Sequence, residues 1–136
     1  MPVDTIMAKL LDANTVIRYL TADDEKKAKR VEKFLRQTTE KLILTDVTVA
    51  EVVWVLESHY EVPKSDIVAK LQLFLTLETV HAAKPLLSDA LTFYWSYNID
   101  YIDAYIAAYA IHHDVDTIVS YDHDLDKIPS ISREEP

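Results

Sequence analysis

Residues Ala8–Asp12 read AKLLD, and residues Thr117–Asp122 read TIVSYD. Each stretch is a short apolar run that ends in a single carboxylate. Apolar runs of this length are typical of strands buried on both faces of a parallel sheet. The run Lys41–Thr45 has the same character. We therefore expect strands at Ala8–Leu11, Lys41–Thr45 and Thr117–Ser120, with weaker ones at Thr79–His81 and Ser130–Ser132.

Helical patterns separate these strands. The segment Asp24–Thr38 is amphipathic, with apolar residues on one side and cations on the other. Thr48–His59 and Asp100–His113 are apolar nearly all round, so we expect both to be buried. Strands that alternate with helices indicate an α/β fold with a mostly parallel sheet. The remaining helices are expected at Asn14–Leu20, Ser65–Leu77 and Leu86–Tyr97.

Composition narrows the class of protein. The chain has 136 residues, which fits a single domain over 1–136, and its 49% of hydrophobic residues is ordinary for a globular protein. It has no cysteine, which excludes thiol nucleophiles and cysteine-bound zinc. It also has no glycine, which excludes glycine-rich phosphate loops. Its tight turns must use Asn, Asp, Pro or His instead.

Charge and hydropathy bear on partners and location. No stretch approaches the roughly 18 apolar residues of a membrane span, and the N-terminus has no basic head followed by an apolar run. We expect a cytoplasmic protein with no membrane partner. The formal net charge is −9, so bulk attraction does not hold nucleic acid. A chain of this charge that handles phosphate needs a basic patch or a metal ion.

Two cationic features are candidates for such a patch. The run Lys26–Lys41 holds seven of the fourteen cations, and it either follows a nucleic-acid backbone or is the solvated face of a helix. Arg18 either reaches a phosphate or pairs with Asp23 or Asp24.

Asp12 and Asp122 are the acids that end the two opening stretches. Both lie at the carboxyl ends of expected strands, where open α/β sheets bind ligands. Alternatively, these side chains only cap the helices that follow them, with Asn14 or Asp124 assisting.

Glu51 and Asp103 are acids inside apolar helical runs. A carboxylate in such surroundings is rarely buried unless it is paired or bound to a metal. Each also has a purely structural explanation. Thr48-x-x-Glu51 fits a capping box, and Asp100-x-x-Asp103 fits a weaker cap whose charge suits a helix N-terminus.

Four carboxylates in one crevice would repel one another. At about 4 Å and an effective dielectric of about 20, each pair costs about 4 kcal/mol. Convergence therefore requires a counter-ion, and an all-oxygen ligand set selects a hard divalent cation such as Mg²⁺ or Mn²⁺. A carboxylate-held Mg²⁺ activates water against a phosphodiester and stabilises the leaving oxygen.

Four blocks of the chain carry a family resemblance. They are Leu11–Thr15 (LDANT), Thr48–Glu51 (TVAE), Tyr101–Ala110 (YIDAYIAAYA) and Val119–Leu125 (VSYDHDL). In order and spacing the chain resembles the PIN-domain family of metal-dependent ribonucleases, most of all its short VapC-like toxins. The family often has glycine around the third block, where this chain has Asn98 and the pair His113-Asp114; Asn and Asp tolerate left-handed backbone. The resemblance implies a PIN-like three-layer fold with a mostly parallel central sheet of four to five strands flanked by helices.

The same resemblance implies roles for particular residues. Asp12, Glu51, Asp103 and Asp122 would be the catalytic and metal-binding acids, with Asn14, Ser120 and Asp124 as supporting polar groups. Three of these acids would bind the metal directly or nearly so, and Glu51 would act through a water on it.

The function implied is that of an Mg²⁺-dependent endoribonuclease, the toxin of a toxin–antitoxin pair. Mn²⁺ is the alternative ion, and the partners would be RNA, a cognate antitoxin and a second copy of the chain in a homodimer. Two other functions stay open. One is a catalytically silent PIN-like interaction module; the other is a receiver-type phospho-signalling domain, against which stands the lack of a Lys at the end of a late strand.

Overall fold

The computed structural model describes residues 7–136, and residues 1–6, on which part of the expectation about a secretory leader rests, lie outside that range. In chain order the elements are β1 (Ala8–Leu10), α1 (Ala13–Thr21), α2 (Glu25–Gln37), β2 (Lys41–Ile43), α3 (Asp46–Ser58), α4 (Lys64–Phe74), β3 (Val80–His81), α5 (Lys84–Ser96), α6 (Tyr101–His112), β4 (Thr117–Val119), the 3₁₀ helix η1 (His123–Lys127) and β5 (Ser132–Glu134). Every expected helix and strand is present, and η1 is an addition. Within the described part of the chain, the helices are all too short or too polar to cross a membrane.

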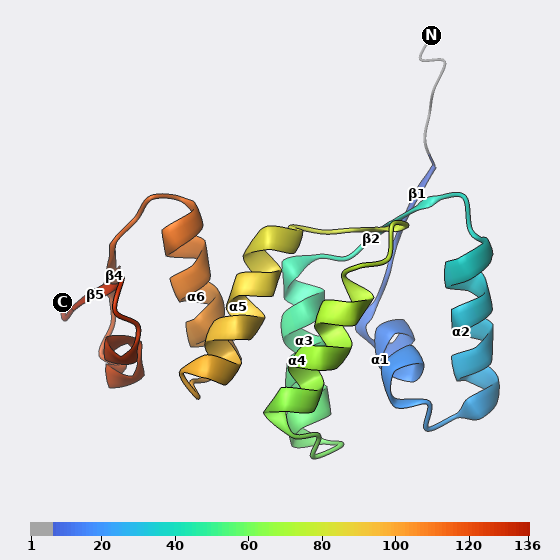
Figure 1. Ribbon diagram of the computed structural model, residues 1–136, viewed down its shortest axis with the longest axis horizontal. Coiled ribbons are helices and arrows are strands. Elements are labelled where there is room, and N and C mark those ends of the chain that lie inside the picture. Colours follow the sequence, from blue (N-terminus) through green and yellow to red (C-terminus); the bar gives the residue numbers. More distant parts are fainter. Residues whose placement is uncertain (1–6) are drawn as a thin grey trace, which may run out of the picture.

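The strands form two parallel sheets (Figure 1). β2 lies between β1 and β3, with Leu10 opposite Ile43 and Ile43 opposite His81. Among residues 7–136, β4 pairs only with β5, with Ile118 opposite Arg133. The α/β class and the parallel pairing expected from the sequence are therefore confirmed. The five strands, however, are divided between a three-stranded and a two-stranded sheet and do not form one central sheet.

A group of helices separates the two sheets. In Figure 1, α3, α4, α5 and α6 stand between β1 and the β4–β5 pair, with α1 and α2 at one end of the molecule. The core lies among these helices and the three-stranded sheet. Leu42 of β2, Val52 and Leu56 of α3, and Leu87 and Leu91 of α5 have no exposed surface.

The expected burial of the strands on both faces is wrong for β1 and β4. Leu10 of β1 is 71% exposed, and Val119 of β4 is 61% exposed. The apolar composition of each strand does favour a sheet, and both strands form. Each strand, however, has a neighbour on one side only, and nothing within residues 7–136 covers the side chains of Leu10 and Val119.

The two all-apolar helices are also only partly buried. α3 exposes Val47 and Trp54, and α6 exposes Ile102, Ile106 and Tyr109. Complete burial of both helices, expected from their composition, is therefore wrong. Each helix keeps a second apolar side that nothing within residues 7–136 covers.

A seam of small side chains joins α5 and α6, which pack side by side (Figure 1). Ala90 of α5 and Ala104 and Ala107 of α6 are fully buried, and small side chains let helix axes approach closely. The Tyr94 and Tyr101 rings meet edge to face at 5.8 Å, and His112 Nε2 lies 2.6 Å from the Asp89 carboxylate. These contacts fix α6, and with it β4, which follows after the short connection 113–116.

Turns that would ordinarily use glycine use other residues here. Asn98 before α6 and Asp114 after it have φ values of 50° and 57°, as their types allow. Ala22 and Glu61 also take positive φ values, of 50° and 52°, so the expectation that only Asn, Asp, Pro or His would serve is wrong at these two turns.

The α5–α6 seam predicts a sharp sensitivity to added volume. We expect Ala104→Leu to lower the free energy of unfolding by about 1–3 kcal/mol, because a branched side chain has no space there. The matched control is Ala69→Leu, on an exposed position of α4, which should change it by less than about 0.5 kcal/mol. Urea denaturation checks both, and equal effects would contradict a tight seam.

Candidate metal centre

Three carboxylates meet at the start of α6. Asp103, Asp122 and Asp124 each offer a carboxylate oxygen, and these oxygens lie within 4.8 Å of one another. Asp103 is in the first turn of α6, Asp122 is the N-cap of η1, and Asp124 is in η1. The cluster therefore depends on the packing of α6 against the β4–η1 segment.

The turn after β4 sets the positions of Asp122 and Asp124. The Asp124 N–H donates to Asp122 Oδ1 at 2.9 Å, and the Asp122 N–H donates to Ser120 Oγ at 2.9 Å. Capping by Asp122, the structural alternative from the sequence, is thus confirmed. It leaves the carboxylate beside Asp103, so capping and metal binding are compatible. Ser120 holds the turn, as a supporting group would.

The pKa values of Asp103 and Asp122 are shifted in opposite directions. Burial raises the pKa of Asp103 to about 6, and the neighbouring Asp122 adds to this effect. The pKa of Asp122 is lowered, chiefly because the Asp103 carboxyl donates a hydrogen bond to it. Without a cation, and below about pH 6, Asp103 therefore carries a proton that it donates towards Asp122.

Nearby cations only partly compensate these acids. Lys127 Nζ lies 3.3 Å from Asp124 Oδ1. Arg133, whose pairing was not anticipated from the sequence, donates through Nε to Asp126 Oδ1 at 2.9 Å and lowers the pKa of that carboxyl. Asp126 is thus occupied by an ion pair, whereas Asp103 and Asp122 have no ion pair among the described residues.

Asp12 and Asn14 lie at a different place. Asp12 caps α1 by accepting the Thr15 N–H at 2.9 Å, and this bond lowers its pKa. The capping alternative is confirmed for this residue as well. Asp12 and Asn14 line a surface hollow of about 410 Å³ together with three cations, Arg18, Lys27 and Arg30. Within one chain, the structure does not bring Asp12 into the cluster of Asp103.

Glu51 lies on the exposed side of α3. The N-cap of that helix is Thr45, whose Oγ1 accepts the Thr48 N–H at 3.2 Å, so Glu51 is in the second turn. The capping box with Thr48 as its first residue is therefore wrong. Glu51 makes no hydrogen bond or ion pair within residues 7–136 and is outside the three-carboxylate cluster. A capping role therefore does not explain why Glu51 occupies this position.

The cap expected from Asp100 is also absent. Asp100 occupies the N-cap position of α6, but its side chain makes no capping hydrogen bond. Asp103 remains in the first helical turn, where its negative charge is favourable. That benefit competes with the repulsion from Asp122.

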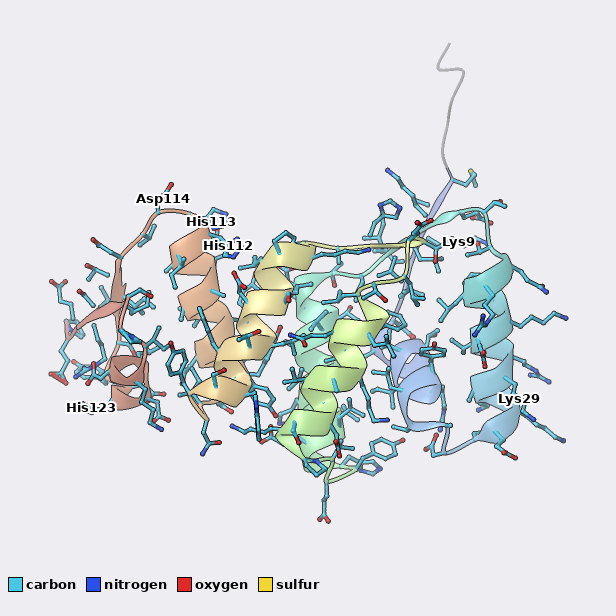
Figure 2. All side chains as sticks on the ribbon, viewed as in Figure 1. Lys9, Lys29, His112, His113, Asp114 and His123 are labelled. Atoms are coloured by element: carbon cyan, nitrogen blue, oxygen red, sulfur yellow. The ribbon has the colours of Figure 1, made fainter. Side chains whose placement is uncertain are left out.

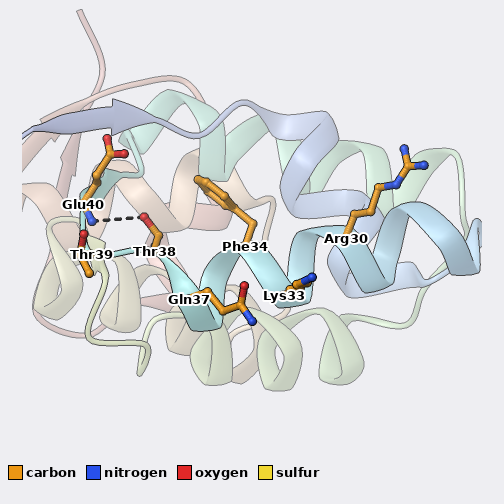
Figure 3. Close-up of a pocket in the computed structure, with 7 residues that line it drawn as sticks. All are labelled: Arg30, Lys33, Phe34, Gln37, Thr38, Thr39 and Glu40. Atoms are coloured by element: carbon orange, nitrogen blue, oxygen red, sulfur yellow. Dashed lines mark hydrogen bonds between the residues drawn. The ribbon is translucent and has the colours of Figure 1, made fainter.

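The cations of α2 form a strip beside Asp12. Arg30 lines both the hollow at Asp12 and a second hollow with Lys33 and Phe34 (Figure 3). Arg18 donates to Asp23 at 3.0 Å, which confirms the pairing alternative for that residue. Figure 2 shows Lys29 and His123 at opposite ends of the molecule, so the cationic strip and the acidic cluster are well separated in one chain.

Comparison with known families now decides the class of protein. The PIN domain profile matches residues 9–131. The chain belongs to the PIN-domain family. No curated protein matches the chain. The match spans β1 through η1, so Asp12 and the Asp103 cluster fall inside one PIN domain, and a receiver domain is set aside.

PIN domains are generally nucleases that act on nucleic acids, and they typically use divalent metal ions. The residues present fit such an ion. Asp103, Asp122 and Asp124 supply oxygen ligands only, which suits a hard cation. Burial, together with the neighbouring Asp122, raises the pKa of Asp103, and a bound cation would favour its charged form. Asp124, expected only as a supporting group, is a member of this set. Its spacing in Asp122-x-Asp124 was the available signal, since an N-cap carboxylate that accepts the N–H two residues later lies close to that residue.

The position of Glu51 generates a first prediction. Glu51→Gln should leave the free energy of unfolding within about 0.5 kcal/mol of wild type, because the side chain has no cap to lose. Thr45→Ala should lower it by about 1 kcal/mol, because the N-cap bond disappears. Thermal and urea melts of both variants check this; destabilisation by Glu51→Gln equal to that by Thr45→Ala would restore a structural role.

The raised pKa of Asp103 generates a second prediction. The pKa of Asp103 is about 6 in the folded protein, whereas its ordinary value is 3.8. Between these two pH values the folded state therefore binds more protons than the unfolded state. The metal-free protein should therefore lose stability as pH rises from about 4 to about 6. Asp103→Asn should flatten this loss and stabilise the protein in EDTA at neutral pH.

Urea denaturation in EDTA across this pH range measures the effect. The matched control is Asp66→Asn, an exposed acid in the first turn of α4, which should keep the wild-type slope. A wild-type slope no steeper than that of Asp103→Asn would show that the pKa of Asp103 is not raised.

Proposed function

We propose that the protein is an Mg²⁺-dependent endoribonuclease. The observation that carries this proposal is the cluster of Asp103, Asp122 and Asp124 inside a PIN domain. These three residues would hold the ion, with Mn²⁺ as the alternative. When bound, such an ion polarises the scissile phosphate and makes water nucleophilic near neutral pH.

The residues of the chain have separate tasks in this proposal. At or below about pH 6, Asp103 would give up its proton when the cation binds, because the positive charge favours the charged carboxylate. Ser120 fixes the turn that carries Asp122. Asp12 and Glu51 lie outside this cluster within one chain; they would orient the attacking water where a second copy brings them to it, and Asn14 would support Asp12.

The cations of α2 would attract the RNA backbone locally, although the net charge of the protein is negative. Lys27, Arg30 and Lys33 lie along the two hollows on the side of α2 near Asp12. RNA phosphates bound by these cations would bring the RNA strand close to Asp12. Binding of this kind weakens as salt concentration rises.

The biological setting belongs to the same proposal. A small PIN nuclease of this kind would be the toxin of a toxin–antitoxin pair, with a cognate antitoxin and a homodimer as its assemblies. The cytoplasm, where cellular RNA is found, is the proposed location. The exposed apolar sides of α3 and α6 are suited to contacts with other chains.

A second candidate is a catalytically silent PIN module. The separation of Asp12 and Glu51 from the Asp103 cluster within one chain favours it, because a single chain then lacks two of the expected acids. Such a module would bind partners without cleaving RNA.

Cleavage assays distinguish the two candidates. We expect wild-type protein to cut single-stranded RNA with Mg²⁺ and not with EDTA, and Asp122→Asn to lower the rate by about 100-fold or more. Asp66→Asn, an exposed acid far from the cluster in sequence, serves as the matched control and should cut at the wild-type rate. Metal-independent cutting, or equal rates for wild type and Asp122→Asn, would rule out the proposed nuclease.

A further inference from the structure

Two strand edges face solvent at opposite ends of the molecule. Within the described residues, β1 pairs only with β2 and β4 only with β5. Leu10 and Val119, on these two strands, are the exposed apolar residues named above. Unpaired edges of this kind accept a further strand readily. Joining β1 to β4 would give one five-stranded sheet in the order β3-β2-β1-β4-β5.

We propose that β4 of a second copy of this chain pairs with β1, so that two copies build each catalytic site. The partner's Asp103, Asp122 and Asp124 would then stand beside Asp12 and Glu51. The catalytic role of this composite site rests on the proposed function. The strand exchange between copies is tested separately from that function. In a symmetric dimer the exchange is reciprocal and produces two composite sites.

The contacts of α6 argue for a second copy as the occupant. β4 follows α6 after only the connection 113–116, and the helical group α3–α6 stands between β1 and β4 (Figure 1). α6 is held by the alanine seam with α5, by the His112–Asp89 pair and by the hydrogen bond from Tyr105 to Asp46 of α3. β4 cannot reach β1 of its own chain while these contacts persist.

Charge complementarity supports the same occupant. α2, beside β1, carries six cations and two acids, whereas residues 114–136 carry seven acids and two cations. Figure 2 shows Lys29 of α2 and His123 of η1 at the two ends. Two copies aligned antiparallel therefore place the basic end of each against the acidic end of the other, and opposite charges steer such encounters.

The uncovered apolar sides fit this arrangement. Val47 and Trp54 flank Glu51 along α3, and Ile102 and Ile106 flank Asp103 along α6. Each proposed site acid thus lies on a helix side that has exposed apolar neighbours. Covering these sides in the dimer would remove water from around the carboxylates, which strengthens their interaction with a cation.

Engineered cysteines test the strand exchange directly, because the chain has no cysteine of its own. A mixture of Leu10→Cys and Val119→Cys proteins should oxidise to a covalent dimer, since strands that pair bring side chains within disulfide reach. A second mixture contains Ile118→Cys in place of Val119→Cys, and it tests a pairing register shifted by one residue. The matched control partner is Leu73→Cys on α4, where Leu73 is 71% exposed, as Leu10 is.

We expect at least about tenfold more covalent dimer from the Leu10→Cys mixture with Val119→Cys or Ile118→Cys than from the mixture with Leu73→Cys. No excess at either register would overturn the inference. So would a double variant, Leu10→Cys with Val119→Cys, that forms its bridge only within one chain. Circular dichroism confirms that each variant is folded before oxidation.

Mixing two inactive variants gives an independent readout. Asp12→Asn and Asp103→Asn proteins, unfolded together and refolded, should recover about a quarter of wild-type cleavage, because half of the dimers are mixed and each has one intact site. Sites built within one chain would recover none. Covalent dimers without any wild-type cleavage would leave the inference standing and refute the proposed function; cleavage without them would do the reverse.

Discussion

The alanine seam between α5 and α6 determines where the chemistry of this protein can occur. Ala90, Ala104 and Ala107 are fully buried there, and the two helices bring Tyr94 against Tyr101. Because α6 is fixed, Asp103 in its first turn and β4 after its last turn are fixed too. The acidic cluster is thereby assembled at one end of the molecule, and β1, with Asp12 after it, is left with a free edge at the other.

Much of the fold could be predicted from local pattern. Short apolar runs and helical periodicity located every α-helix and every strand but not the 3₁₀ helix η1, since these features depend on neighbouring residues. The division into two sheets could not be predicted, because the same apolar composition of β1 suits a central strand and a strand with one free edge. The exposed sides of α3 and α6 could not be predicted for a related reason: a helix that is apolar all round does not show which of its sides the rest of the chain covers.

The site was predictable to a similar extent. Asp103 and Asp122 were brought together by α6 and the turn after β4, and Asp124 joined them through a 3₁₀ turn that no periodicity indicated. For Asp12 and Asp122, the observed capping does not exclude metal binding, because a carboxylate can accept a backbone N–H and still face a cation. For Glu51, only the observed start of α3 at Asp46 removed the capping explanation. Sequence spacing does not predict the position of Asp12 relative to Asp103, because that position depends on tertiary or quaternary contacts.

The central claim is that the Asp103 cluster is a divalent-cation site, and proton release during Mn²⁺ binding tests it most directly. Calorimetric titrations at about pH 6, in buffers of different ionisation enthalpy, count the protons released. Because the pKa of Asp103 is about 6, wild-type protein should release about half a proton per ion bound, and Asp103→Asn should release none. Binding with no proton release in wild type, or an unchanged release in Asp103→Asn, would contradict the claim.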